Sequence, residues 1–221
     1  LRSAAGQKLG MDRRLRTAFE GGKLALHYQP VVESATRRIL AAEALLRWED
    51  GENGFVSPSE FVPIAEETGF MVPIGSWVLT EACRQLRSWI DGGLPPIRMA
   101  VNVSRCQLER GDFAAEVERV LSATGLEPGL LELELSERGT LRSDPSILSQ
   151  LRKLRALGVR IVVDDFGTGQ SAIAYLRHLP LDGLKIDGSF VGGVESDGDD
   201  SVIVSAIAAM GNQLGLDVVV E

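Results

Sequence analysis

The stretch that most constrains the fold is the run from Ile161 to Gly169, Ile-Val-Val-Asp-Asp-Phe-Gly-Thr-Gly. Three β-branched residues in a row are typical of a strand that is buried on both faces, as strands of parallel sheets are. Asp164 and Asp165 then lie side by side at the carboxyl end of that strand. Two adjacent carboxylates are costly in free energy unless a cation lies next to them. The run therefore predicts a buried strand that ends in a cation site.

Strand-like and helix-like segments alternate along most of the chain, which predicts an α/β fold with a mostly parallel sheet and covering helices. We expect strands at 24–32, 39–48, 98–104, 130–136, 160–166, 183–187 and 217–221. We expect helices at 11–20, 58–68, 73–91, 112–124, 144–157, 170–178 and 199–214. The repeated units suit either a closed barrel or an open doubly wound sheet.

The first two expected strands are separated by only six residues, Glu33 to Arg38. A parallel crossover needs about a dozen residues or more, so these strands should form an antiparallel hairpin. The expected strands number seven, and the chain has 221 residues. An eight-stranded barrel typically takes about 250 residues. We therefore expect a barrel that is truncated before its eighth strand.

Charge and composition exclude several classes of partner. The net charge of −8 disfavours broad attraction to DNA or RNA, so we expect no nucleic-acid partner. An acidic chain that binds a phosphate compound needs a metal ion or local arginines. Cys83 and Cys106 fall in different expected elements without metal-type spacing, and we interpret them as ordinary cytosolic thiols. No apolar stretch reaches the ~18 residues of a membrane span.

Polar side chains recur near the carboxyl ends of the expected strands, where parallel barrels gather their functional groups. Residues two apart share a strand face, so these side chains should point into the barrel while apolar neighbours pack on helices. They are Glu43, Asn102, Glu134, Asp164, Asp165, Lys185 and Glu221. Oxygen ligands with one amide suit Mg²⁺ or Mn²⁺, and adjacent aspartates suit two ions. Any one of them alone is more often a plain strand-end polar group; their convergence favours the metal-site interpretation.

Several motifs in the chain resemble those of a known family. Glu43-Ala44-Leu45 resembles the signature that names the EAL domain, a cyclic di-GMP phosphodiesterase module. Other motifs match the family in order: Tyr28-Gln29-Pro30, the segment 57–66, Asn102-Val103-Ser104, Glu134-Leu135-Ser136-Glu137, Asp164 to Gly169 and Leu184-Lys185-Ile186-Asp187. The resemblance covers roughly residues 11–221 and leaves 1–10 as a linker or tail. It implies a modified (β/α)₈ TIM barrel with an antiparallel first strand, in agreement with the hairpin.

The resemblance also implies an activity and residue roles. The activity is hydrolysis of cyclic di-GMP to linear pGpG with two Mg²⁺ or Mn²⁺ ions. Four residues are implied to bind one ion, and Asp164 with Asp165 to hold the second; the four are Glu43, Asn102, Glu134 and Asp164. Lys185 and Glu221 are implied to position or deprotonate the attacking water. The remaining implied roles are substrate contacts for Gln29 and Arg47 and a loop anchor for Glu137, which holds the turn that starts at Asp165.

The chain departs from the family pattern at two places. Gln170, Ser171 and Ala172 stand where the family usually has an aromatic residue and two serines. Glu221 corresponds to the first glutamate of the family's Glu-Gly-Val-Glu segment, and the sequence stops there. Two other functions therefore stay open: a non-catalytic EAL-like module that binds cyclic di-GMP or docks a partner, and another metal-dependent barrel hydrolase.

The resemblance further implies a homodimer in bacterial second-messenger signalling and an upstream GGDEF or sensor domain. It implies a cytoplasmic domain, and the sequence leaves open whether the intact protein is anchored to the inner membrane. The apolar run from Val202 to Ala209 is too apolar for a solvated helix, so we expect it to be buried against the barrel.

Overall fold

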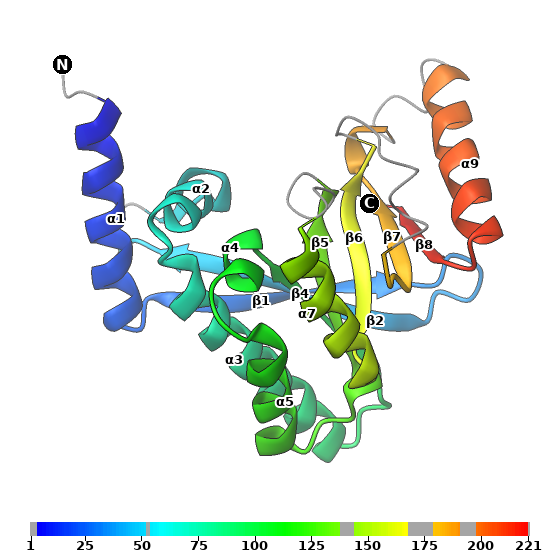
Figure 1. Ribbon diagram of the computed structural model, residues 1–221, viewed down its shortest axis with the longest axis horizontal. Helices are drawn as coiled ribbons and strands as arrows, with labels where there is room; N and C mark the ends of the chain where they lie inside the picture. Colours follow the sequence, from blue (N-terminus) through cyan, green and yellow to red (C-terminus); the bar gives the residue numbers. More distant parts are fainter. Residues whose placement is uncertain (1–3, 52–53, 138–143, 168–178, 191–197, 221) are drawn as a thin grey trace.

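The computed structural model describes residues 4–51, 54–137, 144–167, 179–190 and 198–220. Its centre is one curled sheet in the order β1-β2-β4-β5-β6-β7-β8 (Figure 1). The bounds are β1 Leu24–Val32, β2 Ile39–Glu49, β4 Arg98–Val103, β5 Leu131–Ser136, β6 Arg160–Phe166, β7 Gly183–Ile186 and β8 Asp217–Val220. β1 pairs antiparallel with β2, and each later pair along the path is parallel. Within the described chain, β1 and β8 are the two edges of this open barrel.

Helices cover the outer face of the sheet. α3, α5 and α7 lie side by side there, and α3 contacts β4 while α7 contacts β6 (Figure 1). The bounds are α1 Ala4–Glu20, α2 Pro58–Thr68, α3 Met71–Asp91, α4 Arg105–Glu109, α5 Phe113–Thr124, α7 Pro145–Ala156 and α9 Gly198–Gln213. No helix in the described ranges is both long and apolar enough to cross a membrane.

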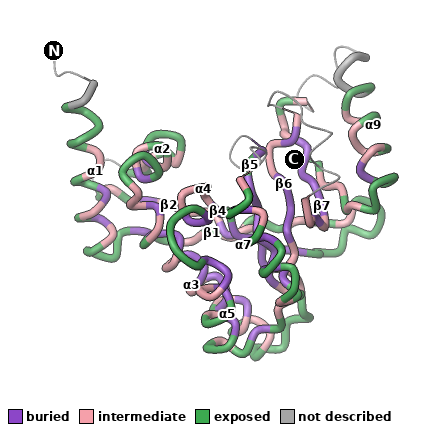
Figure 2. Tube along the Cα trace, viewed as in Figure 1, coloured by how far each residue is buried: buried purple, intermediate pink, exposed green. Residues whose placement is uncertain are grey.

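The core forms between the strands and these helices, as the period-two pattern predicts. Leu131, Leu133 and Leu135 of β5 are each at most 2% exposed and belong to one cluster with Leu151 of α7. Burying one such leucine contributes about 1.5–3 kcal/mol. The central strands are accordingly buried along most of their length, whereas α1 and α9 carry long exposed stretches (Figure 2). The opposite strand faces, which carry the polar residues, turn toward the inside of the curl.

The predicted hairpin of the first two strands is confirmed, with Gln29 opposite Glu43 in its register. The predicted strands agree with the observed ones to within one residue over the described positions. The short β3 (Phe55–Val56), the helix α4 and two 3₁₀ turns, η2 (Pro128–Leu130) and η3 (Gly188–Phe190), were not predicted, because elements so short carry no periodic signal. The helix predicted at 170–178 and the end of the last strand at Glu221 lie outside the described residues.

Two helix predictions need correction. The first helix begins at Ala4 and not at residue 11. Gly6 and Gly10 weaken the helical pattern there, but Lys8 Nζ lies 2.7 Å from Glu67 Oε2 of α2, which helps to hold the added turns. The apolar run in α9 is only partly buried: α9 contacts β7 and β8, yet Val202 is 64% and Ile203 40% exposed.

The amino-terminal end of the sheet is closed by an ion network on the inner strand face. Glu132 of β5 accepts a hydrogen bond of 3.1 Å from Arg160 of β6, and its Oε2 lies 3.3 Å from Arg98 of β4. Arg160 also reaches Asp217 of β8 at 2.6 Å. The Glu132 side chain is 9% exposed, and both arginines are about one-quarter exposed. Glu132 thus ties three strands together below the predicted site.

We expect Glu132→Gln to lower the free energy of unfolding by about 2 kcal/mol, because it leaves two part-buried guanidinium groups without their shared carboxylate. Urea unfolding of the metal-free protein measures this. Glu81→Gln is the matched control, since the Glu81–Arg84 pair is exposed and should be worth at most about 0.5 kcal/mol. Equal effects of the two substitutions would contradict a structural role for the network.

Candidate functional site

The ammonium group of Lys185, on β7, lies among three carboxylates that come from three other strands. Its Nζ is 2.8 Å from Glu43 Oε2, 3.2 Å from Glu134 and 3.4 Å from Asp164 Oδ1. The exposed fractions of the four side chains are small: 3% for Lys185, 12% for Glu43, 1% for Glu134 and 14% for Asp164. The cluster is therefore nearly closed to water. We call these four residues the lysine–carboxylate cluster.

Strand register explains why residues so far apart in sequence meet. β2, β4, β5, β6 and β7 are neighbours, and the parallel register sets Asn102 beside Glu134 and Ser136 beside Asp164. Asn102 extends the cluster because its Nδ2 donates a 2.8 Å hydrogen bond to Glu43 Oε1. This bond leaves the amide oxygen of Asn102 as a potential cation ligand. The structure thus brings together Glu43, Asn102, Glu134, Asp164 and Lys185.

Within the cluster, Glu134 has a strongly raised pKa. Burial, together with the nearby charges of Glu43 and Asp164, raises the pKa of its carboxyl group to about 9, against the attraction of Lys185. Asp164 Oδ1 is buried and accepts no hydrogen bond, so its nearest recorded partner is the ammonium at 3.4 Å. One ammonium group therefore balances three closely spaced carboxylates incompletely, and the cluster attracts further positive charge.

The donor types fit a hard divalent cation, although the side chains are not arranged around one. Among the residues that the structure describes, no group of three or more His, Cys, Asp and Glu side chains is positioned to hold a metal ion. Carboxylate oxygens and one amide oxygen are nevertheless the ligands that Mg²⁺ and Mn²⁺ prefer. Asp164 Oδ1 fits the role of a cation ligand, because buried oxygen atoms without a hydrogen bond are rare in proteins.

Asp165 does not join the lysine–carboxylate cluster but turns toward Asp187. Its backbone has φ 54°, a left-handed conformation that is unusual outside glycine. Hydrogen bonds from Ser189 lower the pKa of the Asp187 carboxyl group, and a hydrogen bond with Asp165 adds to this. Asp187 ends the motif that starts at Leu184, but the sequence alone gives it no role. It lies two residues after Lys185, so the period-two pattern was the signal that could have found it.

The turn after Asp165 is held by Glu137. Glu137 is 2% exposed, and its Oε2 accepts a 2.9 Å hydrogen bond from the Gly167 N–H. Gly167 has φ 104°, and a Cβ there would lie 2.9 Å from the Phe190 ring. Only glycine therefore fits this position. The remainder of the turn lies outside the described residues. So does Glu221, which was predicted to be catalytic.

Cavities flank the cluster on several sides. Gln29, Glu43 and Lys185 line one of 810 Å³ that extends along β8, and Arg47 with Asn102 lines another of 270 Å³. A third, of 910 Å³, is lined by Glu137, Asp165 and Asp187 among others. Gln29 and Arg47 thus border the same region as the cluster, and in the described chain neither side chain hydrogen-bonds to a side chain of the cluster.

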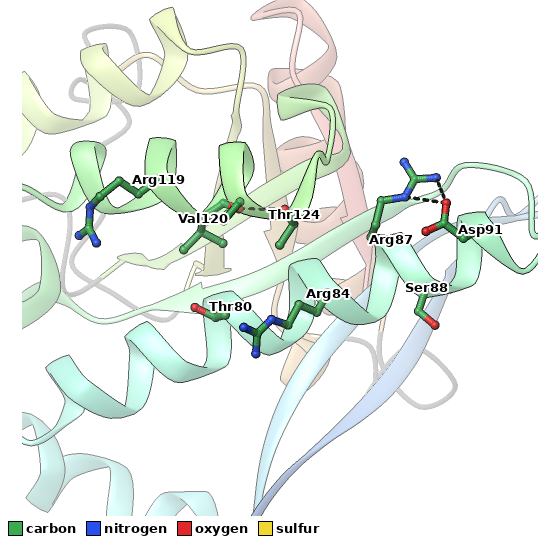
Figure 3. A pocket seen from close by; sticks show the side chains of 9 residues that line it. Thr80, Arg84, Arg87, Ser88, Asp91, Arg119, Val120 and Thr124 are labelled. Atoms are coloured by element: carbon green, nitrogen blue, oxygen red, sulfur yellow. Dashed lines mark hydrogen bonds and ion pairs between the residues drawn. The ribbon is translucent and has the colours of Figure 1, made fainter.

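A groove of 570 Å³ between α3 and α5 lies apart from these cavities (Figure 3). Its walls carry Arg84, Arg87 and Arg119, but Arg84 pairs with Glu81 at 2.8 Å and Arg87 pairs with Asp91 at 2.6 Å. Two of its three cations are thus already neutralised on the surface. None of the residues predicted for the site lines this groove, so the lysine–carboxylate cluster remains the candidate site.

The fold and the cluster define a class of protein: a TIM-barrel-like α/β protein with a nearly buried carboxylate site inside its curled sheet. The family model described as "EAL domain" matches residues 12–221. Because this match spans almost the whole chain, the chain belongs to the EAL domain family. The predicted family and fold are both confirmed.

Curated relatives support the same placement. The chain is 44% identical over 217 residues to the bifunctional diguanylate cyclase/cyclic di-GMP phosphodiesterase MucR of Pseudomonas aeruginosa. It is 41% identical over 217 residues to the cyclic di-GMP phosphodiesterase NbdA of the same species. Each match covers 98% of this chain but only 32% and 28% of the respective relative. The chain therefore spans about a third or less of the length of these two relatives.

Solved structures show the same fold. A c-di-GMP complex of the MucR phosphodiesterase matches with a TM-score of 0.90 at 44% identity and covers 96% of this chain and 85% of that one. The EAL enzyme Bd1971, bound to cAMP and cyclic di-GMP, matches with a TM-score of 0.93 at 30% identity, over 99% of this chain and 60% of that one. These are proteins that the chain resembles closely in fold.

The pKa of Glu134 predicts a pH dependence of stability. Because the pKa rises from 4.5 unfolded to about 9 folded, the folded state binds the proton more tightly, and stability should fall as pH rises through this window. We expect metal-free wild type to lose more stability between pH 5 and pH 8.5 than Glu134→Gln does. Urea unfolding in a chelator measures this, and parallel pH profiles of the two proteins would contradict the strain at Glu134.

Proposed function

We propose that this chain hydrolyses cyclic di-GMP to linear pGpG in a site with two Mg²⁺ or Mn²⁺ ions. The observation that carries the proposal is the meeting of Glu43, Glu134 and Asp164 around Lys185 inside the barrel. Membership of the EAL family and a close structural neighbour in complex with c-di-GMP support the choice of substrate.

Four side chains hold one ion in this proposal: Glu43, Asn102, Glu134 and Asp164. Asp164, with Asp165, would also hold a second ion. When bound, the ions would lower the pKa of a water molecule and neutralise charge that develops on the phosphoryl group. The chain's own part is to fix these oxygen ligands on adjacent strands and to keep bulk water out of the cluster.

Lys185 and Glu221 position or deprotonate the attacking water. Lys185 suits the orienting role, because an ammonium among carboxylates donates hydrogen bonds but keeps its own proton. In the reaction, the water oxygen forms a bond to phosphorus while one ribose ester P–O bond breaks in line with it. The water proton passes to a basic group of the site, and the ribose oxygen leaves with a proton.

Arg47 and Gln29 contact the substrate in this proposal, Arg47 by forking onto phosphate oxygens. Glu137 anchors the turn that begins at Asp165, through its bond to the Gly167 N–H. The domain acts in the cytoplasm as a homodimer within bacterial second-messenger signalling. A GGDEF or sensor domain precedes it in the intact protein, a proposal that the much greater length of its relatives supports.

We expect Glu43→Gln to lower kcat for cyclic di-GMP by about 10²-fold or more. The substitution replaces a negatively charged ligand by a neutral amide, which weakens cation binding. Chromatographic detection of pGpG in the presence of Mn²⁺ measures the rate. The matched control is Glu49→Gln, an exposed glutamate on the same strand, which should keep wild-type activity.

An absence of pGpG from the wild type, as complete as that from Glu43→Gln, would exclude the phosphodiesterase. Tight cyclic di-GMP binding in a chelator without any turnover would then identify the non-catalytic receptor instead. Hydrolysis of other phosphodiesters in place of cyclic di-GMP would point to another metal-dependent barrel hydrolase.

For Arg47, we expect substitution by lysine to raise KM for cyclic di-GMP by about tenfold with a smaller change in kcat. Lysine keeps the charge but loses the planar fork that binds two phosphate oxygens at once. Steady-state kinetics separate the two constants. An unchanged KM would show that Arg47, whose Nη1 donates to the Leu46 carbonyl at 3.0 Å, acts on the protein backbone alone.

A further inference from the structure

We propose that Lys185 is a built-in occupant of the cation site: in the metal-free protein its ammonium group fills the space among the carboxylates, and a divalent ion must displace it to bind. The inference rests on the proposed function only in taking these carboxylates as metal ligands. It gives Lys185 a positioning role in addition to its proposed role toward water. Lys185 then sets the metal affinity of the site.

The Lys185 ammonium group lies where a metal ion would bind. Lys185 Nζ lies 2.8–3.4 Å from oxygens of Glu43, Glu134 and Asp164, with both Glu134 oxygens at 3.2 Å. A Mg²⁺ ion bound to such oxygens needs distances of about 2.0–2.1 Å. An ion bound among these oxygens would therefore lie within contact distance of the present ammonium position. The two cations cannot share that space.

The Lys185 ammonium group also balances the charge of the carboxylates. In the described part of the chain, the recorded ion pairs of Glu43, Glu134 and Asp164 all go to Lys185. With side chains only 1–14% exposed, water screens these carboxylates poorly, so a nearby cation stabilises their charged forms. Lysine suits this task because its compact charge sits on a flexible four-carbon stem that can withdraw.

Two opposite consequences follow for a neutral residue at position 185. The metal-free protein loses the cation that holds the carboxylates together, so it becomes less stable. The metal ion loses its competitor and meets a more negative site, so it binds more tightly. A residue that only packs the interior would lower stability without tightening metal binding, which makes the gain in affinity the distinguishing readout.

The test is Mn²⁺ binding by isothermal calorimetry, without cyclic di-GMP, to wild type and to Lys185→Met. We expect the substitution to tighten Mn²⁺ binding at least tenfold, to lower the Tm of the metal-free protein and to enlarge the Tm shift on adding Mn²⁺. The control is Lys153→Met, an exposed lysine 3.2 Å from Asp112, which should change none of these quantities.

Unchanged or weaker Mn²⁺ binding by Lys185→Met overturns the proposal, as does a failure of both proteins to bind Mn²⁺. If Lys185→Met does not fold without metal, the double variant Lys185→Met/Glu43→Gln decides: recovery of folding supports a role through charge, and continued failure overturns it. If Lys185→Met binds Mn²⁺ more tightly than the wild type but the wild type yields no pGpG, the proposed function is contradicted and this inference stands.

Discussion

The attraction between one ammonium group and three nearly buried carboxylates is the interaction on which the interior of this barrel depends. Glu43, Glu134 and Asp164 come from strands that are distant in sequence, and Lys185 draws all three to within 3.4 Å of its Nζ. The hydrophobic core on the outer strand faces fixes the register that makes this meeting possible. Core packing thus sets the positions of the carboxylates, and their excess negative charge over Lys185 makes the cluster a place where a further cation can bind.

The inner face of β5 shows how stability and function are separated along one strand. Glu132, near the amino end, is shared by two part-exposed arginines and ties neighbouring strands together. Glu134, two residues further along, shares a single ammonium group with Glu43 and Asp164. Burial and these two neighbouring charges raise its pKa to about 9. This division matches the general behaviour of parallel barrels, whose carboxyl ends carry chemistry while their amino ends carry stability.

Much of this arrangement could be predicted from the sequence, because period-two alternation fixes which strand residues face inward. The inward positions of Glu134 and Lys185 and the antiparallel hairpin follow from spacing alone. The register that sets Gln29 opposite Glu43 does not, because it depends on an irregularity between Val31 and Val32. What spacing lacks is distance: it could not show that Lys185 sits among the carboxylates, or that Asp165 turns away toward Asp187. Those outcomes depend on a left-handed residue and on tertiary electrostatics.

The most direct test of the account is anomalous diffraction from crystals grown with Mn²⁺ and cyclic di-GMP. We predict two Mn²⁺ peaks beside the cluster, both ligated by Asp164, with Glu43, Asn102 and Glu134 on one ion and Asp165 on the other, and with Lys185 Nζ withdrawn from its present place. Peaks elsewhere, or an ammonium that still fills the space among the three carboxylates in a substrate-bound crystal, would contradict it.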